Sequence, residues 1–163
     1  MADEITGAYP GHLACEYVNL GTYETPVFTR IKRVEDVDLP DERGTSEFRI
    51  KGSDFTRTIR GVRTKGVAFK YRKKRSEDLV FNELKEAYED PNKCIEYAAC
   101  DRPIADVGAA GFRGPFVVTK FNETRPFESV VEVDIELKFA DADHPVDAPE
   151  AWEIEPFVTE AEV

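Results

Sequence analysis

The sequence contains few of the residues on which disulfide-rich proteins and metalloenzymes depend. Its 163 residues include two histidines and three cysteines, and Cys15, Cys94 and Cys100 are irregularly spaced. An odd number of cysteines favours reduced, buried thiols over a disulfide framework. A metal site built from these thiols and His12 is the alternative, but the spacing matches no zinc-binding motif. We therefore predict buried thiols, no metal and no cofactor.

Long apolar runs and catalytic motifs are also missing. No stretch approaches the roughly 20 apolar residues that span a bilayer, and the acidic start, MADE, lacks the apolar run of a secretory signal. Gly108, Gly111 and Gly114 have the wrong spacing for a dinucleotide-binding turn, and no nucleophile–histidine–acid pattern is present. We expect a protein without a catalytic site that is assembled in a cytoplasm and does not enter a membrane.

Positive charge is scarce overall, and half of it lies in one segment. The chain has 22 Lys and Arg against 33 Asp and Glu, a net charge of −11, which argues against a general binder of nucleic acids or anionic membranes. Residues 49–75 nevertheless hold 11 basic residues and one acidic residue, whereas residues 1–48 and 76–163 have net charges of −6 and −15. A strongly basic segment therefore lies inside an acidic protein.

Three interpretations of this basic segment remain open. In the first interpretation it is a solvated strand face, as most charge runs are. Alternatively it forms a nucleic-acid groove, in which Phe55, Phe69 and Tyr71 lie between the basic residues. In the third interpretation it meets the acidic surface of another copy, and a head-to-tail contact of that kind produces rings or filaments.

The clearest periodicity lies near the end of residues 111–140. Its apolar positions are Val131, Val133, Ile135, Leu137 and Phe139, and they alternate with Glu132, Asp134, Glu136 and Lys138. Successive strand side chains point to opposite faces, so this alternation predicts a strand with one face against a core and a charged outer face. The Phe-rich run before the turn at 122–126 predicts its antiparallel partner, and the pair should form the middle of a sheet. Acids on such a face are more typically solvated than catalytic.

Other segments predict further strands and one helix. Ser76 can N-cap a helix at residues 76–89, whose apolar residues recur at helical spacing until Asp90 and Pro91. The remaining strands are predicted at residues 27–39 with a bulge near Val34, at 45–50 after a turn at 40–44, at 56–72 and at 95–100. This order predicts an α+β fold, a mostly antiparallel β-sandwich or open barrel with one flanking helix.

The chain divides into three parts on composition. Residues 1–26 are predicted to be an aromatic-containing N-terminal arm, and residues 27–140 the β domain. Residues 141–163 are predicted to be an acidic, proline-rich C-terminal tail.

In the order of these segments and in their patterns of apolar and charged residues, the chain resembles the major tail tube proteins of long-tailed bacteriophages. The resemblance covers about residues 27–140. The matching segments are FTRIKRVEDV at 28–37, RGVRTKGVAFKY at 60–71, DLVFNELKEAY at 78–88, GFRGPFVVTKF at 111–121 and VEVDIELK at 131–138. The proline-broken acidic tail departs from the minimal pattern of that family.

The resemblance implies a structural virion protein. Members of the family, which is similar in fold to the tubes of type VI secretion systems and contractile injection machines, form hexameric rings. The rings stack into a hollow tube whose inner wall is a β-barrel shared among subunits. The implied partners are other copies of the chain and the tape measure, tail terminator and tail tip proteins, while DNA passes through without specific binding. The implied location is the phage tail, after assembly in the host cytoplasm.

Two alternatives to this function stay open. One is another tail or neck joint protein, such as a tail terminator, which would share the fold but stop at one ring. The other is a nucleic-acid-binding protein that uses residues 49–75 and whose binding falls steeply with salt.

Two sets of site residues are predicted under the resemblance. The first set lies near contacts between subunits or rings and faces acids of a neighbour: Lys51, Arg57, Arg60, Arg63 and Lys65. The second set faces the lumen, where carboxylates repel DNA weakly and let it slide: Glu132, Asp134 and Glu136. A competing assignment places this acidic face outside, in solvent.

Overall fold

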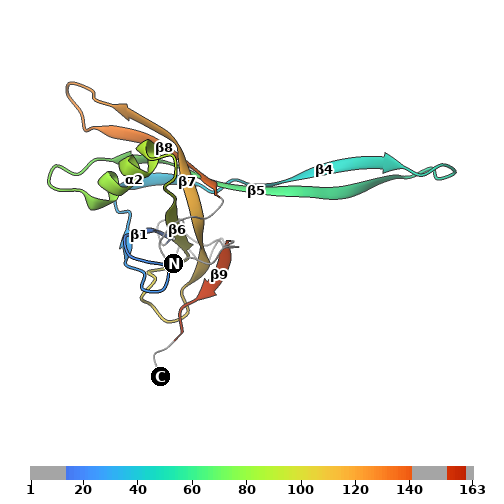
Figure 1. The fold of residues 1–163 in the computed structure, drawn as a ribbon, viewed down its shortest axis with the longest axis horizontal. Helices are drawn as coiled ribbons and strands as arrows, with labels where there is room; N and C mark the ends of the chain where they lie inside the picture. The colour runs from blue at the N-terminus through green and yellow to red at the C-terminus, as the bar shows by residue number, and fades with distance from the viewer. Residues whose placement is uncertain (1–13, 141–153, 161–163) are drawn as a thin grey trace, which may run out of the picture.

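The computed structural model describes residues 14–140 and 154–160 (Figure 1). Its elements are β1 (Cys15–Asn19), β2 (Phe28–Arg30), β3 (Val34–Asp38), β4 (Asp41–Arg49), β5 (Thr56–Arg72), α2 (Leu79–Glu89), β6 (Ile95–Cys100), β7 (Ala110–Thr124), β8 (Glu132–Phe139) and β9 (Glu155–Val158). The predicted arm and tail are described only at residues 14–26 and 154–160, which contribute β1 and β9. The division into three parts stays a prediction. No helix in the described part of the chain is long and apolar enough to cross a bilayer.

The strands form one antiparallel sheet in the order β2-β1-β6-β7-β8-β5-β3. β8 pairs with the second half of β7 and β9 with its first residues, while β4 pairs only with β5. The central β7–β8 pair is the one that the alternation predicted. The described residues contain a single helix beside this sheet, so the predicted α+β class is confirmed.

The two end strands of the sheet belong to one continuous segment. β2 and β3 are separated only by residues 31–33, and the backbone of these residues forms hydrogen bonds with β1 on one side and with the end of β5 on the other. The amide of Ile31 donates to the Glu16 carbonyl at 2.9 Å, and the amide of Arg72 donates to the Arg33 carbonyl at 3.0 Å. The pairing register shifts between Val34 and Val37, which confirms the predicted bulge. The sheet is thus an open barrel whose two edges are bridged by residues 28–38.

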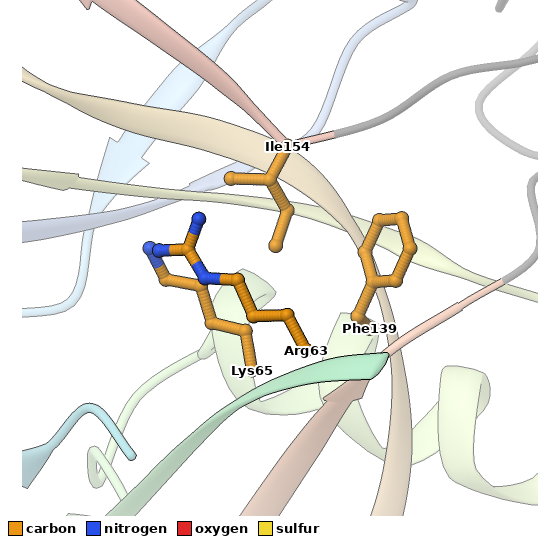
Figure 2. Close-up of a pocket in the computed structure, with 4 residues that line it drawn as sticks. All are labelled: Arg63, Lys65, Phe139 and Ile154. Carbon is orange, nitrogen blue, oxygen red and sulfur yellow. The ribbon is translucent and has the colours of Figure 1, made fainter. Parts of the chain in front are cut away.

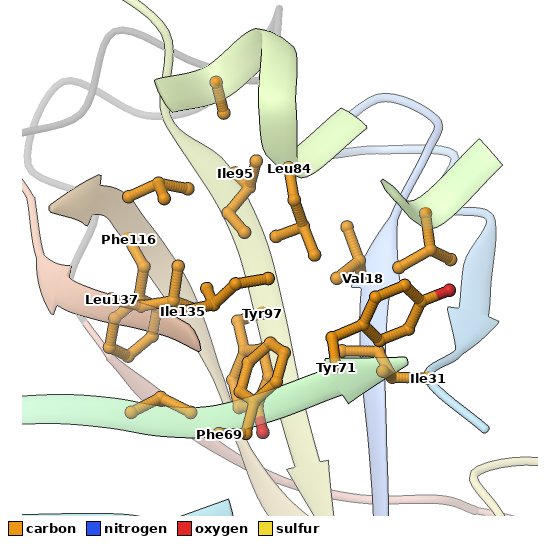
Figure 3. Packing of buried hydrophobic residues seen from close by; sticks show 14 of the residues in the cluster. Val18, Ile31, Phe69, Tyr71, Leu84, Ile95, Tyr97, Phe116, Ile135 and Leu137 are labelled. Atoms are coloured by element: carbon orange, nitrogen blue, oxygen red, sulfur yellow. The ribbon is translucent and has the colours of Figure 1, made fainter. Parts of the chain in front are cut away.

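The main core lies between one face of this curved sheet and α2 (Figure 3). Apolar residues of β5 and β8 that alternate in sequence face inward together, and Val133, Ile135 and Leu137 are at most 1% exposed. Leu84 of α2 is fully buried against them, and Phe121 of β7 lies 5.5 Å from the Phe81 ring. Each such side chain contributes about 1.5–3 kcal/mol through burial.

α2 begins later than predicted, because its N-cap is Asp78 and not Ser76. The Asp78 carboxylate accepts from the amide of Phe81 at 3.1 Å, from the amide of Lys74 at 3.0 Å and from the Tyr71 hydroxyl at 2.6 Å. Burial by itself raises the pKa of Asp78, but these hydrogen bonds outweigh it and hold the pKa below its ordinary value. Asp78 therefore joins the helix to β5 through charge-assisted bonds.

A second, smaller cluster covers the other face at β1 and β6. It contains Cys15, Tyr17, Ala98 and Cys100. All three cysteines of the chain are buried, as predicted, and burial raises the pKa of Cys100 to about 12. Among the described residues no group of three or more His, Cys, Asp or Glu could hold a metal ion, while His12 lies outside them.

Next to this cluster lies a charged pair that the sequence did not reveal. The Glu96 carboxylate is buried, with the Arg113 Nε 2.5 Å from one oxygen and the Asn19 amide donating to the other at 2.6 Å. The Arg113 guanidinium lies 4.8 Å from the Tyr23 ring centre. Burial raises the pKa of Glu96 even though Asn19 and Arg113 oppose the shift. The pair joins β1, β6 and β7, and removal of one partner would leave an uncompensated buried charge.

Replacing Asp78 with Asn should lower the free energy of unfolding at pH 7 by about 1–2 kcal/mol, because the charged N-cap acceptor is lost. The folded-state pKa of Asp78 is depressed, so its stabilisation is present above the unfolded-state pKa of about 3.9 and is lost as pH falls through the folded-state value. Urea unfolding should therefore show the gap between variant and wild type closing in acid. Glu77→Gln, at the exposed neighbouring residue, is the control. A difference in the free energy of unfolding between Asp78→Asn and wild type that stays the same at all pH values would contradict this account.

Candidate subunit interface

A two-stranded hairpin projects far from the sheet (Figure 1). It consists of β4 and the first part of β5, and we call residues 41–64 the projecting hairpin. Every residue of β4 is exposed, and β5 is exposed from Thr56 to Thr64 before it enters the core. Nine residues of strand at about 3.4 Å each give β4 a length of about 30 Å. One strand, β5, is thus shared between the core and the projection.

Local sequence accounts for the hairpin shape. Threonine, isoleucine and valine are frequent in its second strand, and β-branched residues favour extended backbone. At the tip, Gly52 has a φ of +89°, a conformation that suits glycine, and the Ser53 amide donates to the Ile50 carbonyl at 3.0 Å. Gly44 and Gly61 approach each other where the register shifts between Arg43 and Thr45. The sequence had predicted a turn at 40–44, but this segment is the start of β4 with an irregularity at the glycine.

The outer half of the hairpin has one face that carries apolar side chains and one polar face. Direct pairing of Ser46 with Ile59 and of Phe48 with Arg57 places Phe48 and Ile59 on the same face, beside Ser46 and Arg57. Both are exposed, as is Ile50 just beyond the strand. The opposite face carries Thr45, Glu47, Arg49, Thr56, Thr58 and Arg60. A two-stranded hairpin is only marginally stable alone, and exposed apolar side chains on one face mark a contact surface for another protein.

The predicted contact residues all lie on or beside this hairpin but do not act alike. The register of β4 and β5, with its shift between Arg43 and Thr45, places Arg60, Arg63 and Lys65 on one face and Arg57 on the other, while Lys51 lies at the tip. Two of the five are engaged within the chain. No ion pair with the described residues engages the other three, Lys51, Arg57 and Arg60.

Asp41 holds the two engaged cations at the base of the hairpin. The Arg63 Nε donates to its carboxylate at 2.6 Å, and this hydrogen bond lowers the pKa of Asp41. The Lys65 ammonium lies 3.9 Å from the same carboxylate and 3.5 Å from the centre of the Phe112 ring. Burial lowers the pKa of Lys65, and Asp41 offsets this only in part. Lys65 is therefore a nearly buried cation with one distant carboxylate.

Two adjoining hollows lie at this base, and together we call them the root hollow. The first, about 260 Å³, is lined by Arg63, Lys65, Phe139 and Ile154 (Figure 2). The second, about 530 Å³, shares the first three of these and adds Pro40, Glu42, Val62, Thr64, Gly66 and Lys138. Basic and apolar side chains therefore surround one space.

The predicted lumen acids lie together on the face of the sheet away from the core. Glu132, Asp134 and Glu136 are all partly buried on β8, between β5 and β7. Each has a cation within 4 Å on a neighbouring strand. The closest N–O distances are 3.4 Å for Arg72–Glu132, 3.9 Å for Lys70–Asp134 and 3.7 Å for Lys120–Glu136. The acids are thus part of a network of ion pairs that spans β5, β8 and β7. In the sequence, Lys70 and Arg72 alternate with apolar residues just as the acids of β8 do, and this was the signal for part of the network.

Comparison with protein-family models and with curated proteins finds no match to this sequence. Solved structures do match. A chain of the native gene transfer agent virion has a TM-score of 0.64 and 16% identity, over 83% of this chain and 96% of that one. The SPP1 tail tube has a TM-score of 0.67 and 14% identity, over 80% of this chain and 75% of that one.

A third similar structure comes from a contractile machine. A chain of the sheath–tube complex of the extracellular contractile injection system PVC has a TM-score of 0.63 and 8% identity, over 97% of both chains. The same kind of likeness extends to the tail of the empty gene transfer agent particle, which has C6 symmetry. The protein therefore has the fold of tail tube proteins, as the order of its sequence segments had suggested.

Proposed function

We propose that this protein is a structural virion component that assembles into stacked, six-membered rings and forms the tail tube through which DNA passes. The projecting hairpin is the observation that carries the proposal. Its first strand is about 30 Å long, and it exposes apolar side chains together with Lys51, Arg57 and Arg60, a form that is marginal in a monomer and is stabilised against a second copy. The C6 symmetry of the similar gene transfer agent tail supports six copies in a ring.

The proposal assigns a structural role and no reaction. The other proposed partners are the tape measure, terminator and tip components of a tail. The location is the virion, after assembly in the host cytoplasm. DNA is cargo that slides through the tube.

Assembly should depend on the apolar face of the hairpin. Ile59→Glu should raise the protein concentration needed for assembly by at least about tenfold, because a carboxylate would be buried against the neighbouring copy. Thr58→Glu is the matched control, since it adds the same charge to the opposite face one residue away. Sedimentation and electron microscopy would measure ring and tube formation. A wild-type protein that stays monomeric at all concentrations, even with a tail initiator complex, would contradict the proposed function.

Contacts between copies should weaken with salt. Exposed ion pairs contribute only about 0.2–1 kcal/mol each and are screened within roughly 10 Å at 0.1 M salt, so the effect must be collective. We expect that reversal of Lys51, Arg57 and Arg60 to Glu reduces assembly and flattens its salt dependence. Assembly that is indifferent to both changes would show that apolar contacts dominate. The control reverses three exposed cations outside the hairpin: Lys32, Arg75 and Lys85.

The acidic face of β8 is proposed to line the lumen. Its neutralisation with Glu132→Gln, Asp134→Asn and Glu136→Gln would remove three carboxylates that lie within 4 Å of Lys70, Arg72 and Lys120, and would leave this face with more positive than negative charge. A wall of net positive charge would then hold DNA through counterion release. Assembled particles should eject DNA slowly or incompletely, measured by dye-monitored ejection. Normal ejection from complete particles would place this face outside the channel.

A further inference from the structure

The root hollow is a mixed basic and apolar space that no side chain of the described residues, 14–140 and 154–160, fills. In Figure 2 the side chains of Phe139 and Ile154 lie across the hollow from the cationic ends of Arg63 and Lys65. Val62, which lines the adjoining part, is 83% exposed. The surface therefore offers an apolar wall and a set of nitrogen donors to something outside the subunit.

The hollow also has more positive than negative charge. Among the described residues its lining includes Arg63, Lys65 and Lys138 and one acid, Glu42. Asp41 is shared between Arg63 and Lys65, and the Lys65 side chain is only 14% exposed. A further carboxylate would compensate this cation, since a desolvated ammonium is stabilised by an additional counter-charge. The chemistry of the hollow thus fits an aromatic side chain next to an acid.

The loop between β7 and β8 presents such a pair. Phe127 is fully exposed, and Glu128 follows it in the sequence. The one basic residue nearby, Arg125, is held by Glu123 at 2.9 Å. No ion pair with the described residues engages Glu128. The loop therefore shows an unburied aromatic ring beside a carboxylate with no counter-ion.

Other exposed apolar groups fit the hollow less well. Phe55 at the tip of the projecting hairpin is 79% exposed and follows Asp54, but Lys51 and Arg57 on either side give the tip a net positive charge, which the cations of the hollow would repel. Val107 follows Asp106 but is smaller and would fill less of the space. Charge and size together select Phe127 and Glu128.

The loop of one subunit cannot reach its own hollow. Phe127 precedes β8, whose seven residue steps separate Glu132 from Phe139 by about 24 Å, so the loop and the hollow lie at opposite ends of this strand. Figure 1 likewise shows the β7–β8 turn on the side away from the projecting hairpin. A contact between loop and hollow must therefore join two copies, and because its two surfaces differ it is a head-to-tail contact that closes a ring or extends a filament.

We propose that Phe127 and Glu128 of one copy dock in the root hollow of the next, with the ring against Val62 and Phe139 and the carboxylate near Lys65 and Lys138. The contact rests on the proposed self-assembly and specifies which surfaces meet. It uses the base of the projecting hairpin and leaves the apolar face of its outer half for another contact.

Disulfide trapping tests the pairing directly. A mixture of Phe127→Cys and Val62→Cys proteins, oxidised by air with copper phenanthroline, should give a covalent dimer that neither protein gives alone. The double variant should give a ladder of covalent oligomers. Phe55→Cys or Val107→Cys mixed with Val62→Cys serves as the matched control. Trapping through Phe55 or Val107 in place of Phe127 would overturn the proposal.

Assembly measurements supply a second test. Phe127→Ala should raise the concentration needed for assembly by at least about tenfold, as truncation of a central aromatic contact does, while its unfolding stays that of the wild type because the ring is exposed. Glu128→Lys should weaken assembly, and addition of Lys138→Glu should restore part of it. Normal assembly of Phe127→Ala would overturn this contact alone. A wild-type protein that never assembles would overturn the proposed function as well.

Discussion

Backbone pairing along β5 is the constraint on which the rest of the structure depends. The strand is 17 residues long, and its last third is paired on both sides, by β8 and by β3, with its apolar residues in the core. Beyond this region its hydrogen-bonding groups have one partner strand, β4. The core anchors one end of the strand, and this fixes the direction in which the projecting hairpin leaves the subunit.

Much of the fold could be predicted because several strands are covered on one side only. In β8 apolar and charged residues alternate throughout, and in the inner part of β5 Val67, Phe69 and Tyr71 recur at every second position, so the strand period and the buried face could be read from the sequence. β1 was missed for the opposite reason. All five of its residues are buried, on both faces, and a strand covered on both sides has no alternation to detect. The helix start was displaced because Ser76 has the composition of an N-cap, whereas Asp78 has the tertiary partner, Tyr71.

The candidate site was predictable in its residues but not in its geometry. Composition located the basic segment, yet nothing local in β4 or β5 indicates that their outer halves leave the sheet, since that depends on where β8 and β3 stop. The cross-strand register also decided which cations are engaged: Asp41, opposite Lys65, lies close to the two cations at the base of the hairpin and leaves the tip cations exposed. Phe127 carried no periodic signal, because a single loop aromatic is ordinary in any sequence.

The continuous segment that bridges β2 and β3 has a consequence for the unassembled protein. Open sheet edges allow strand addition between chains, which is a common route to aggregation. Here the segment that ends the sheet on one side also ends it on the other, so the unpaired edges of a newly made subunit lie mainly in the projecting hairpin, where β4 and the outer part of β5 have only each other as partners. Strand addition between chains is therefore directed to the same projection that carries the proposed contact surface, and away from the sheet that holds the core.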